Sequence, residues 1–263
     1  MKKLYLVTLC FICLLLVGAK KRPITLFLVG DSTMADKEQL DASPERGWGQ
    51  LFPTYLTPDI LVENHARNGR STRTFISEGR WDDVMARLKK GDVVIIQFGH
   101  NDQSVEKVDR YTDPDTYRAN LVRMVTDVRS KRATPILATS VTRRSFKNGK
   151  IVSKHGVYPA IVLAIGKELQ VDVLDMHASS MAAIDRVGEE ASKSLYMHVP
   201  AGLYSKYPEG KEDNTHFVEA GALLMGHLAA DEIRAKKIRP LVNYLRDEKD
   251  YSTTYTTFCT LRK

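Results

Sequence analysis

Short apolar, β-prone runs alternate along this chain with longer stretches in which apolar residues recur at helical spacing. The apolar runs predict five β-strands, at residues 24–29, 60–63, 92–98, 135–139 and 171–174. The stretches with helical periodicity predict α-helices at residues 78–89, 115–132, 158–169 and 220–235. Strands that alternate with helices are typical of βαβ units, so the sequence predicts an α/β protein with a parallel sheet and helices on both faces.

The remaining segments show no clear period. Residues 188–212 contain several Tyr and Pro residues, and we expect a long loop there, a kind of segment that often carries function. From about residue 246 to residue 263 the chain is rich in Thr and Tyr, which indicates a polar tail or an edge strand. Because there is neither an internal repeat nor a low-complexity linker, residues 20–263 are interpreted as a single domain.

The first 19 residues have the layout of a secretory signal. Lys2 and Lys3 form a basic start, residues 4–17 are almost all apolar, and small residues follow up to Ala19. The apolar run is short for a membrane-spanning helix, although an uncleaved N-terminal anchor would share this pattern. We therefore expect residues 1–19 to be removed on export, which gives a secreted or periplasmic protein without stable membrane insertion.

Composition narrows the classes of function. The formal net charge is +7, which raises the question of nucleic-acid binding. Lys and Arg are scattered, however, and neither a basic helix nor zinc-ligand spacing is present, so we expect no nucleic acid as a partner. Of the three cysteines only Cys259 lies outside the signal segment, so the mature chain is expected to be stabilised by its core and not by an intramolecular disulfide.

Polar residues that directly follow the predicted strands are the candidates for chemistry, because open parallel sheets bind ligands at the carboxyl ends of their strands. Ser32 follows the first strand and is a candidate nucleophile, although Asp and Ser at this point are also typical of a helix N-cap. Gly69 follows the second strand and Asn101 the third. Each can offer an N–H group to an oxyanion, while an ordinary turn would use the same residue types.

The segment Asp213-Asn214-Thr215-His216 precedes the last predicted helix. A serine nucleophile needs a base and a carboxylate that orients the base, and an Asp and a His three residues apart on one turn can face each other. As a metal site this pair lacks a third and a fourth ligand at plausible spacing, so we expect no metal. Taken singly, each of the four segments is also compatible with a loop that has no catalytic function.

Taken together and in this order, Gly-Asp-Ser, the glycine of the next loop, Gly-x-Asn-Asp and Asp-x-x-His resemble the SGNH (GDSL-like) hydrolase superfamily. The resemblance implies a three-layer α/β/α flavodoxin-like fold with a five-stranded parallel sheet. It also implies a serine esterase mechanism with Ser32 as nucleophile, His216 as base and Asp213 as the acid that orients the base. The matching oxyanion hole consists of the N–H groups of Ser32 and Gly69 and the side-chain amide of Asn101.

The residues of four motifs resemble those of the rhamnogalacturonan acetylesterase-like branch. These motifs are Arg46-Gly47-Trp48-Gly49-Gln50, Asn68-Gly69-Arg70-Ser71, Gly99-His100-Asn101-Asp102 and Asp213-Asn214-Thr215-His216-Phe217. This resemblance implies removal of acetyl esters from pectic or xylan-type glycans without a metal or an organic cofactor, and we expect a pectic polysaccharide as substrate. His100 and Arg70 are possible substrate contacts, with bracing of their loops as the alternative. Two other functions remain open: an acetyl-xylan or other short-chain carboxylesterase, and a noncatalytic glycan-binding module on the same fold.

Overall fold

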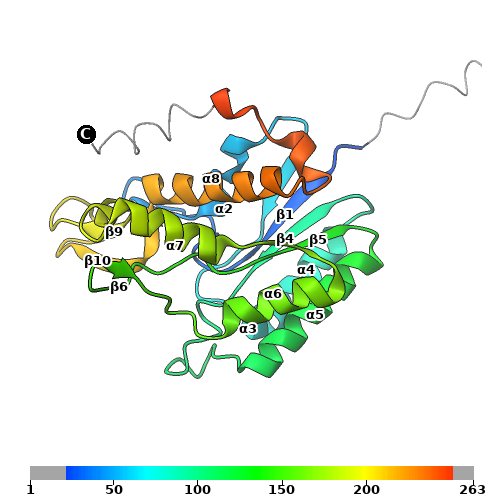
Figure 1. The fold of residues 1–263 in the computed structure, drawn as a ribbon, viewed down its shortest axis with the longest axis horizontal. Helices are drawn as coiled ribbons and strands as arrows, with labels where there is room; N and C mark the ends of the chain where they lie inside the picture. The colour runs from blue at the N-terminus through cyan, green and yellow to red at the C-terminus, as the bar shows by residue number, and fades with distance from the viewer. Residues whose placement is uncertain (1–21, 251–263) are drawn as a thin grey trace, which may run out of the picture.

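The structure is a computed structural model that describes residues 22–250 of the 263-residue chain (Figure 1). The predicted signal segment, residues 1–19, lies outside the described residues, as does most of the predicted tail. The part of the tail that is described ends in a short 3-10 helix, η4 (Glu248–Asp250), and is therefore not an edge strand. Within residues 22–250, no helix combines the length and the apolar character needed to cross a membrane.

A five-stranded parallel sheet forms the centre of the fold (Figure 1). In spatial order its strands are β3 (Leu61–Asn64), β1 (Thr25–Gly30), β4 (Val93–Gln97), β5 (Thr134–Ala138) and β8 (Asp172–Leu174). All five strands expected from the sequence are present. β1 and β4 are buried along their whole length, which is why each stands out in the sequence as a continuous apolar run.

Helices cover both faces of this sheet, because the side chains of each strand alternate between the two faces. Leu26 and Leu28 of β1 pack into one apolar cluster, and Phe27 and Val29 pack into another on the opposite face. The helices over the first cluster are α2 (Trp48–Leu51), α7 (Met176–Val187) and α8 (Glu219–Ala235). Those over the second are α3 (Thr72–Ser77), α4 (Arg80–Arg87), α5 (Pro114–Ser130) and α6 (Tyr158–Leu169). This is the three-layer α/β/α architecture that the resemblance implies.

The helices agree less well with the sequence pattern than the strands do. Three of the four predicted helices are present as α5, α6 and α8, with bounds close to those expected. The fourth, predicted at 78–89, is shorter: Gly79 has a φ of +75° and separates α3 from α4. Helix α7 was not predicted, because its buried face includes the polar or small residues His177, Ser180 and Ala183, which weaken the hydrophobic period.

A smaller antiparallel sheet contains β2 (Glu45–Arg46), β10 (Lys211–Val218) and β9 (Tyr196–Val199), in this spatial order. The prediction of one long loop at 188–212 is therefore wrong. This segment contains η2 (Ala191–Leu195), β9 and the first residues of β10. Tyr196 of β9 is fully buried, and its hydroxyl donates to the carbonyl of Thr142 at 3.0 Å. β9 forms through pairing with β10, and pairing between strands leaves no local period in the sequence.

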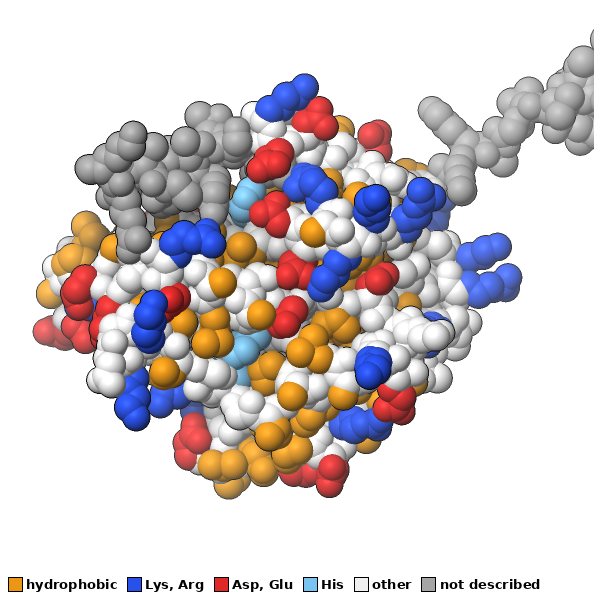
Figure 2. Space-filling model, viewed as in Figure 1, with side chains coloured by type: hydrophobic (Ala, Val, Ile, Leu, Met, Phe, Trp, Pro, Cys, Tyr) orange, Lys and Arg blue, Asp and Glu red, His pale blue; other side chains and the backbone are white. Residues whose placement is uncertain are grey.

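The remaining elements are short. They are η1 (Phe52–Tyr55), η3 (Leu241–Tyr244) and a hairpin of β6 (Phe146–Lys147) and β7 (Lys150–Ile151). On the face of the molecule in Figure 2, Lys and Arg side chains are interspersed with Asp and Glu. This face does not present the continuous basic patch by which nucleic-acid-binding proteins contact phosphates.

The strand order of the central sheet reverses beside β1. The chain passes from β1 to β3 on one side, and then to β4 on the other side of β1. In open parallel sheets, ligands bind at the carboxyl ends of the strands where the order reverses. The topology therefore predicts a ligand site at the loops that follow β1, β3 and β4, which contain Ser32, Gly69 and Asn101.

Candidate active site

Ser32 lies at the carboxyl end of β1, in a turn that begins directly after Gly30. Asp31 in this turn is fully buried, and its Oδ1 accepts hydrogen bonds from the N–H and the hydroxyl of Thr33, at 3.0 and 2.8 Å. A Cβ atom on residue 30 would lie 2.6 Å from the carbonyl oxygen of Gln97 on β4. The turn therefore packs this closely against the sheet only because residue 30 is glycine.

Asp213 and His216 both lie on β10, and not in a turn before the last helix as the sequence suggested. The ladder of β10 is irregular: Asp213 pairs with Met197, and Phe217 pairs with the adjacent Tyr196, so the residues between them bulge outward. Within the bulge His216 Nδ1 lies 2.8 Å from Asp213 Oδ2. The other carboxylate oxygen accepts two backbone N–H groups of the bulge, at 2.7 and 3.1 Å.

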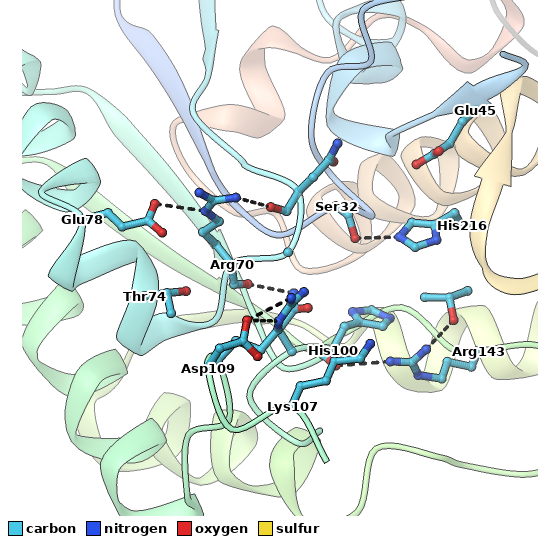
Figure 3. A pocket seen from close by; sticks show the side chains of 15 residues that line it. Ser32, Glu45, Arg70, Thr74, Glu78, His100, Lys107, Asp109, Arg143 and His216 are labelled. Atoms are coloured by element: carbon cyan, nitrogen blue, oxygen red, sulfur yellow. Dashed lines mark hydrogen bonds and ion pairs between the residues drawn. The ribbon is translucent and has the colours of Figure 1, made fainter. Parts of the chain in front are cut away.

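Ser32, His216 and Asp213 form a continuous hydrogen-bonded series. Ser32 Oγ is 2.8 Å from His216 Nε2 (Figure 3). Burial by itself would raise the pKa of Asp213, but the hydrogen bond and the charge of His216, together with the two backbone N–H groups, hold this pKa well below its usual range. An ionised carboxylate only accepts hydrogen bonds, so His216 Nδ1 carries the hydrogen and Nε2 is free to accept from the serine hydroxyl. This is the tautomer in which a histidine can take a proton from a serine.

Gly69 and Asn101 line the same cleft as Ser32. Gly69 has a φ of +77°, a left-handed backbone conformation that glycine adopts without strain. Asn101 is buried, and its Nδ2 donates to the carbonyl of Arg70 at 2.9 Å. Because an amide nitrogen has two hydrogens, this bond fixes the orientation of the side chain and leaves one N–H group to donate into the cleft.

Asp102 connects the two loops that carry Gly69 and Asn101. Its Oδ1 accepts hydrogen bonds from the N–H and the hydroxyl of Thr72, at 2.9 and 2.6 Å. Burial raises the pKa of Asp102 to about 7, against the opposing effect of these hydrogen bonds. The loop after β3 is thus held directly against the loop after β4, which brings the N–H group of Gly69 and the amide of Asn101 to one cleft.

His100 and Arg70, the two substrate contacts suggested by the sequence, line the cleft but are engaged with the protein. His100 Nδ1 lies 3.2 Å from Asp31 Oδ2, and burial lowers the pKa of His100 in spite of this carboxylate. Arg70 Nε donates to Glu78 Oε2 at 3.0 Å, and its Nη1 donates to the carbonyl of Asn68 at 2.9 Å. These bonds brace the surrounding loops, and contact with a substrate stays a prediction for both residues.

The cleft has a volume of about 670 Å³, and Ser32 and His216 are among the residues that line it (Figure 3). Its walls come from the loops after the central strands and from the bulge of β10. Within residues 22–250, no group of three or more His, Cys, Asp or Glu residues is arranged to hold a metal ion. For chemistry, the cleft offers the serine–histidine–aspartate series and the N–H groups around it.

Lys37 is a residue of this site that the sequence analysis does not identify. Its Nζ donates to the carbonyl of Ser32 and to Asn68 Oδ1, at 2.7 Å in each case, and forms an ion pair with Glu45 at 2.9 Å. An ammonium group has three hydrogens, so each of them has an acceptor. Lys37 thereby connects the turn of Ser32 to the loop that carries Gly69. No local pattern reveals this role, because its partners become neighbours only in the folded chain.

Replacing Lys37 with methionine is expected to lower kcat by about 10- to 100-fold with little change in KM, which is the effect of losing a hydrogen bond from a charged donor. Without the ammonium group, the carbonyl of Ser32 and the side chain of Asn68 lose their common donor, so the N–H groups beside them are no longer held in place. Steady-state kinetics with a small soluble acetyl ester measure the effect. In the double variant Lys37→Met/Glu45→Gln no carboxylate is left without its cation, so recovery of kcat there would contradict a positioning role.

Residues 28–222 match the sequence model of the GDSL-like lipase/acylhydrolase family. The chain belongs to this family. The family match begins within β1 and ends within α8, so it includes every segment that contributes Ser32, Gly69, Asn101, Asp213 or His216. The family membership inferred from the order of the motifs is thereby confirmed.

Relatives of this GDSL-like hydrolase include two proteins of Bacillus subtilis (strain 168). Rhamnogalacturonan acetylesterase RhgT is 39% identical over 234 residues, which cover 88% of this chain and 99% of RhgT. The probable rhamnogalacturonan acetylesterase YesY is 33% identical over 210 residues, 80% of this chain and 92% of YesY.

Solved structures of other proteins share the fold. The Bacillus subtilis protein YxiM superposes with a TM-score of 0.72 at 27% identity, over 83% of this chain and 58% of YxiM, so this hydrolase spans little more than half of that protein. The acetylxylan esterase Axe2 of Geobacillus stearothermophilus superposes with a TM-score of 0.56 at 20% identity, over 80% of this chain and 94% of Axe2. At this low identity, the similarity to Axe2 concerns the fold alone.

Proposed function

We propose that this chain is an exported serine esterase that removes O-acetyl groups from a pectic polysaccharide of the rhamnogalacturonan type, with residues 20–263 as its one catalytic domain. The observation that carries the proposal is the hydrogen-bonded series of Ser32, His216 and Asp213 in a chain that is 39% identical to a rhamnogalacturonan acetylesterase. That identity extends over 88% of the chain and is not confined to one motif. Export is proposed from the basic start and the apolar run of residues 1–19.

In the proposed mechanism, Ser32 Oγ attacks the carbonyl carbon of the acetyl ester while His216 Nε2 takes its proton. The negative charge that develops on the carbonyl oxygen is stabilised by the N–H groups of Ser32 and Gly69 and by the free amide hydrogen of Asn101. His216 then gives the proton to the leaving sugar oxygen, and an acetyl-serine remains. Water, deprotonated by His216, hydrolyses this intermediate and releases acetate, while Asp213 stabilises the charged imidazole in both steps.

The lining of the cleft supports a small acyl group on a hydrophilic carrier. Its lining side chains are polar or charged, and no Leu, Ile, Val, Met or Phe is among the described residues that line it. A long acyl chain needs an apolar wall on which to bury its methylene groups, each of which contributes about 0.8 kcal/mol when buried. A polar cleft of about 670 Å³ offers hydrogen-bonding groups to sugar hydroxyls instead.

The test is acetate release from acetylated rhamnogalacturonan and from acetylated xylan at equal acetyl concentration. We expect this hydrolase to release acetate from the pectic polymer with the higher kcat/KM. A higher kcat/KM on acetylated xylan would retain the serine esterase chemistry and overturn the proposed substrate. If neither polymer releases acetate, the proposed substrate is wrong, and if Ser32 is also not labelled by a fluorophosphonate, a noncatalytic glycan-binding function takes the place of the esterase.

A further inference from the structure

Most of the charged side chains that line the cleft are paired with one another. Each of its three carboxylates has a cation as partner: Glu45 pairs with Lys37, Glu78 with Arg70 and Asp109 with Arg110, at 2.9, 3.0 and 3.0 Å. Two further cations line the cleft, Lys107 and Arg143, and neither has a carboxylate of residues 22–250 within ion-pair distance. The described part of the chain thus leaves two positive charges in the cleft without a contacting anion.

Arg143 is the more deeply placed of these two cations. It is partly buried in the loop after β5, and it donates from Nη1 to Thr215 Oγ1 and from Nη2 to the carbonyl of His100, the second at 3.2 Å. Thr215 directly precedes His216, and His100 directly precedes Asn101. The guanidinium group therefore lies between the strand that carries the proposed base and the loop that carries a proposed oxyanion donor.

Arg143 retains hydrogen-bonding capacity. The two bonds use two of the five N–H groups of a guanidinium, and both acceptors are neutral. Burial lowers the pKa of Arg143, and the longer-range charges of Asp31, Asp213 and Glu106 oppose this effect. Asp31 and Asp213 already accept the hydrogen bonds described above. A partly buried guanidinium with only neutral acceptors favours an anion as ligand, because burial of an unpaired charge costs free energy.

We propose that Arg143 binds the carboxylate of a uronic acid unit in the acetylated glycan, with Lys107 as a second cation at the rim of the cleft. This inference rests on the proposed function, since it concerns the substrate of the same site. The guanidinium contacts the neighbours of His216 and Asn101, so the carboxylate belongs to the acetylated sugar or to the sugar next to it. A planar guanidinium can donate to both oxygens of a carboxylate, while the lysine contributes a point charge.

Arg70, which the sequence suggested as a substrate contact, is less suitable for binding a carboxylate. Arg70 is in an ion pair with Glu78, which also pairs with Arg80 at 2.6 Å. A substrate carboxylate at Arg70 would therefore compete with a carboxylate already in place. Arg110 has the same disadvantage, because it pairs with Asp109 at 3.0 Å.

The experiment compares two oligosaccharides with the same acetyl groups that differ only in the carboxylate: one with free galacturonate units, and one in which the carboxylates of these units were converted to neutral methyl esters after acetylation. Acetate release gives kcat/KM for each. We expect the wild-type chain to prefer the anionic substrate, and Arg143→Gln to lower kcat/KM by about 10- to 100-fold on it and by less than about threefold on the neutral one. Lys107→Gln should lower it in the same sense by a smaller factor, because Lys107 is exposed.

The control is Lys90→Gln, which also removes one positive charge. Lys90 is exposed and lies shortly before β4, at the end of the sheet opposite the cleft, so kcat/KM should change on neither substrate. Arg143→Lys retains the charge and should recover part of the preference. Equal kcat/KM of the wild-type chain on the two substrates, or an equal loss on both in Arg143→Gln, would overturn this inference alone. Absence of acetate release from either substrate by the wild-type chain would overturn the proposed function as well.

Discussion

Replacing Ser32 with alanine is expected to lower kcat for acetate release by at least about 10⁴-fold, because the atom that attacks the ester is removed and only binding and the oxyanion donors remain. Ser32 Oγ hydrogen-bonds to His216 Nε2 at 2.8 Å at the surface of the cleft, so its removal should leave the melting temperature nearly unchanged. Acetate release measures the first expectation, and thermal unfolding measures the second. Covalent labelling by a fluorophosphonate should occur in the wild-type chain and be absent in the variant.

The structure contains a matched control for this experiment. Ser153 Oγ also lies 2.8 Å from a histidine, at Nε2 of His177, but Nδ1 of that histidine faces the backbone carbonyl of Ser140 and not a carboxylate. Ser153→Ala should therefore retain both labelling and activity. Ser32→Ala with kcat within tenfold of the wild-type value, or continued labelling of that variant, would contradict the proposed nucleophile.

Replacing Asp213 with asparagine is expected to lower kcat at neutral pH by about 10⁴-fold, the magnitude found when the acid of a serine protease triad is replaced in this way. The asparagine amide can donate to His216 Nδ1, which places the imidazole hydrogen on Nε2 and prevents it from accepting the serine proton. The overall geometry is retained, so KM should change little. Steady-state kinetics at neutral pH test the prediction.

Asp213→Asn should also show a characteristic pH dependence of stability. The pKa of Asp213 is lowered in the folded chain from an ordinary value of 3.8, so its carboxylate stabilises the folded state above this value and loses that effect as the pH falls through the folded pKa. The variant should thus be less stable than the wild-type chain at pH 7, and the difference should shrink as the pH falls below about 4. Thermal unfolding across this range measures the difference.

Two further variants separate the catalytic effect of Asp213 from a general effect of charge. Asp185 is half-buried, has a lowered pKa because of its bonds to Ile151 N–H and Lys150, and does not line the cleft, so Asp185→Asn should retain full kcat. Asp31 is bonded to a histidine that lines the cleft, at 3.2 Å from His100. If Asp31→Asn abolished turnover while Asp213→Asn retained it, Asp31 would replace Asp213 as the acid of the series.

The central sheet could be predicted from the sequence because its interior strands are buried on both faces. Val93–Gln97 of β4 lies wholly inside the protein, so every position is under the same constraint and the strand reads as a run of apolar residues. Helix α7 and strand β9 could not be predicted in this way. The buried face of α7 includes Ser180 and Ala183, and β9 is a strand only because β10 pairs with it. Neither condition is expressed in the local pattern.

The candidate site, too, could be predicted from the sequence only in part. Ser32, Gly69 and Asn101 could be identified because each lies in the loop that follows a strand, and parallel strands bring their carboxyl ends to one edge of the sheet. The three-residue spacing of Asp213 and His216 was visible, but the β10 bulge that turns their side chains together was not. The sequence also could not show that Arg70 forms an ion pair with Glu78 while Arg143 forms none with a carboxylate of residues 22–250, since ion pairs depend on distances between side chains.

The sequence by itself therefore determined the family, the central sheet and the residue types at the ends of its strands, because burial and turn formation act on neighbouring residues and leave local patterns. Only the tertiary structure decided how the charges of the cleft are distributed. Lys37 contacts Asn68 across 31 positions and Arg143 contacts Thr215 across 72, and nothing near either residue encodes its partner. Contacts of this kind arise when distant loops are packed against one sheet edge, so they can be identified only after the chain has folded.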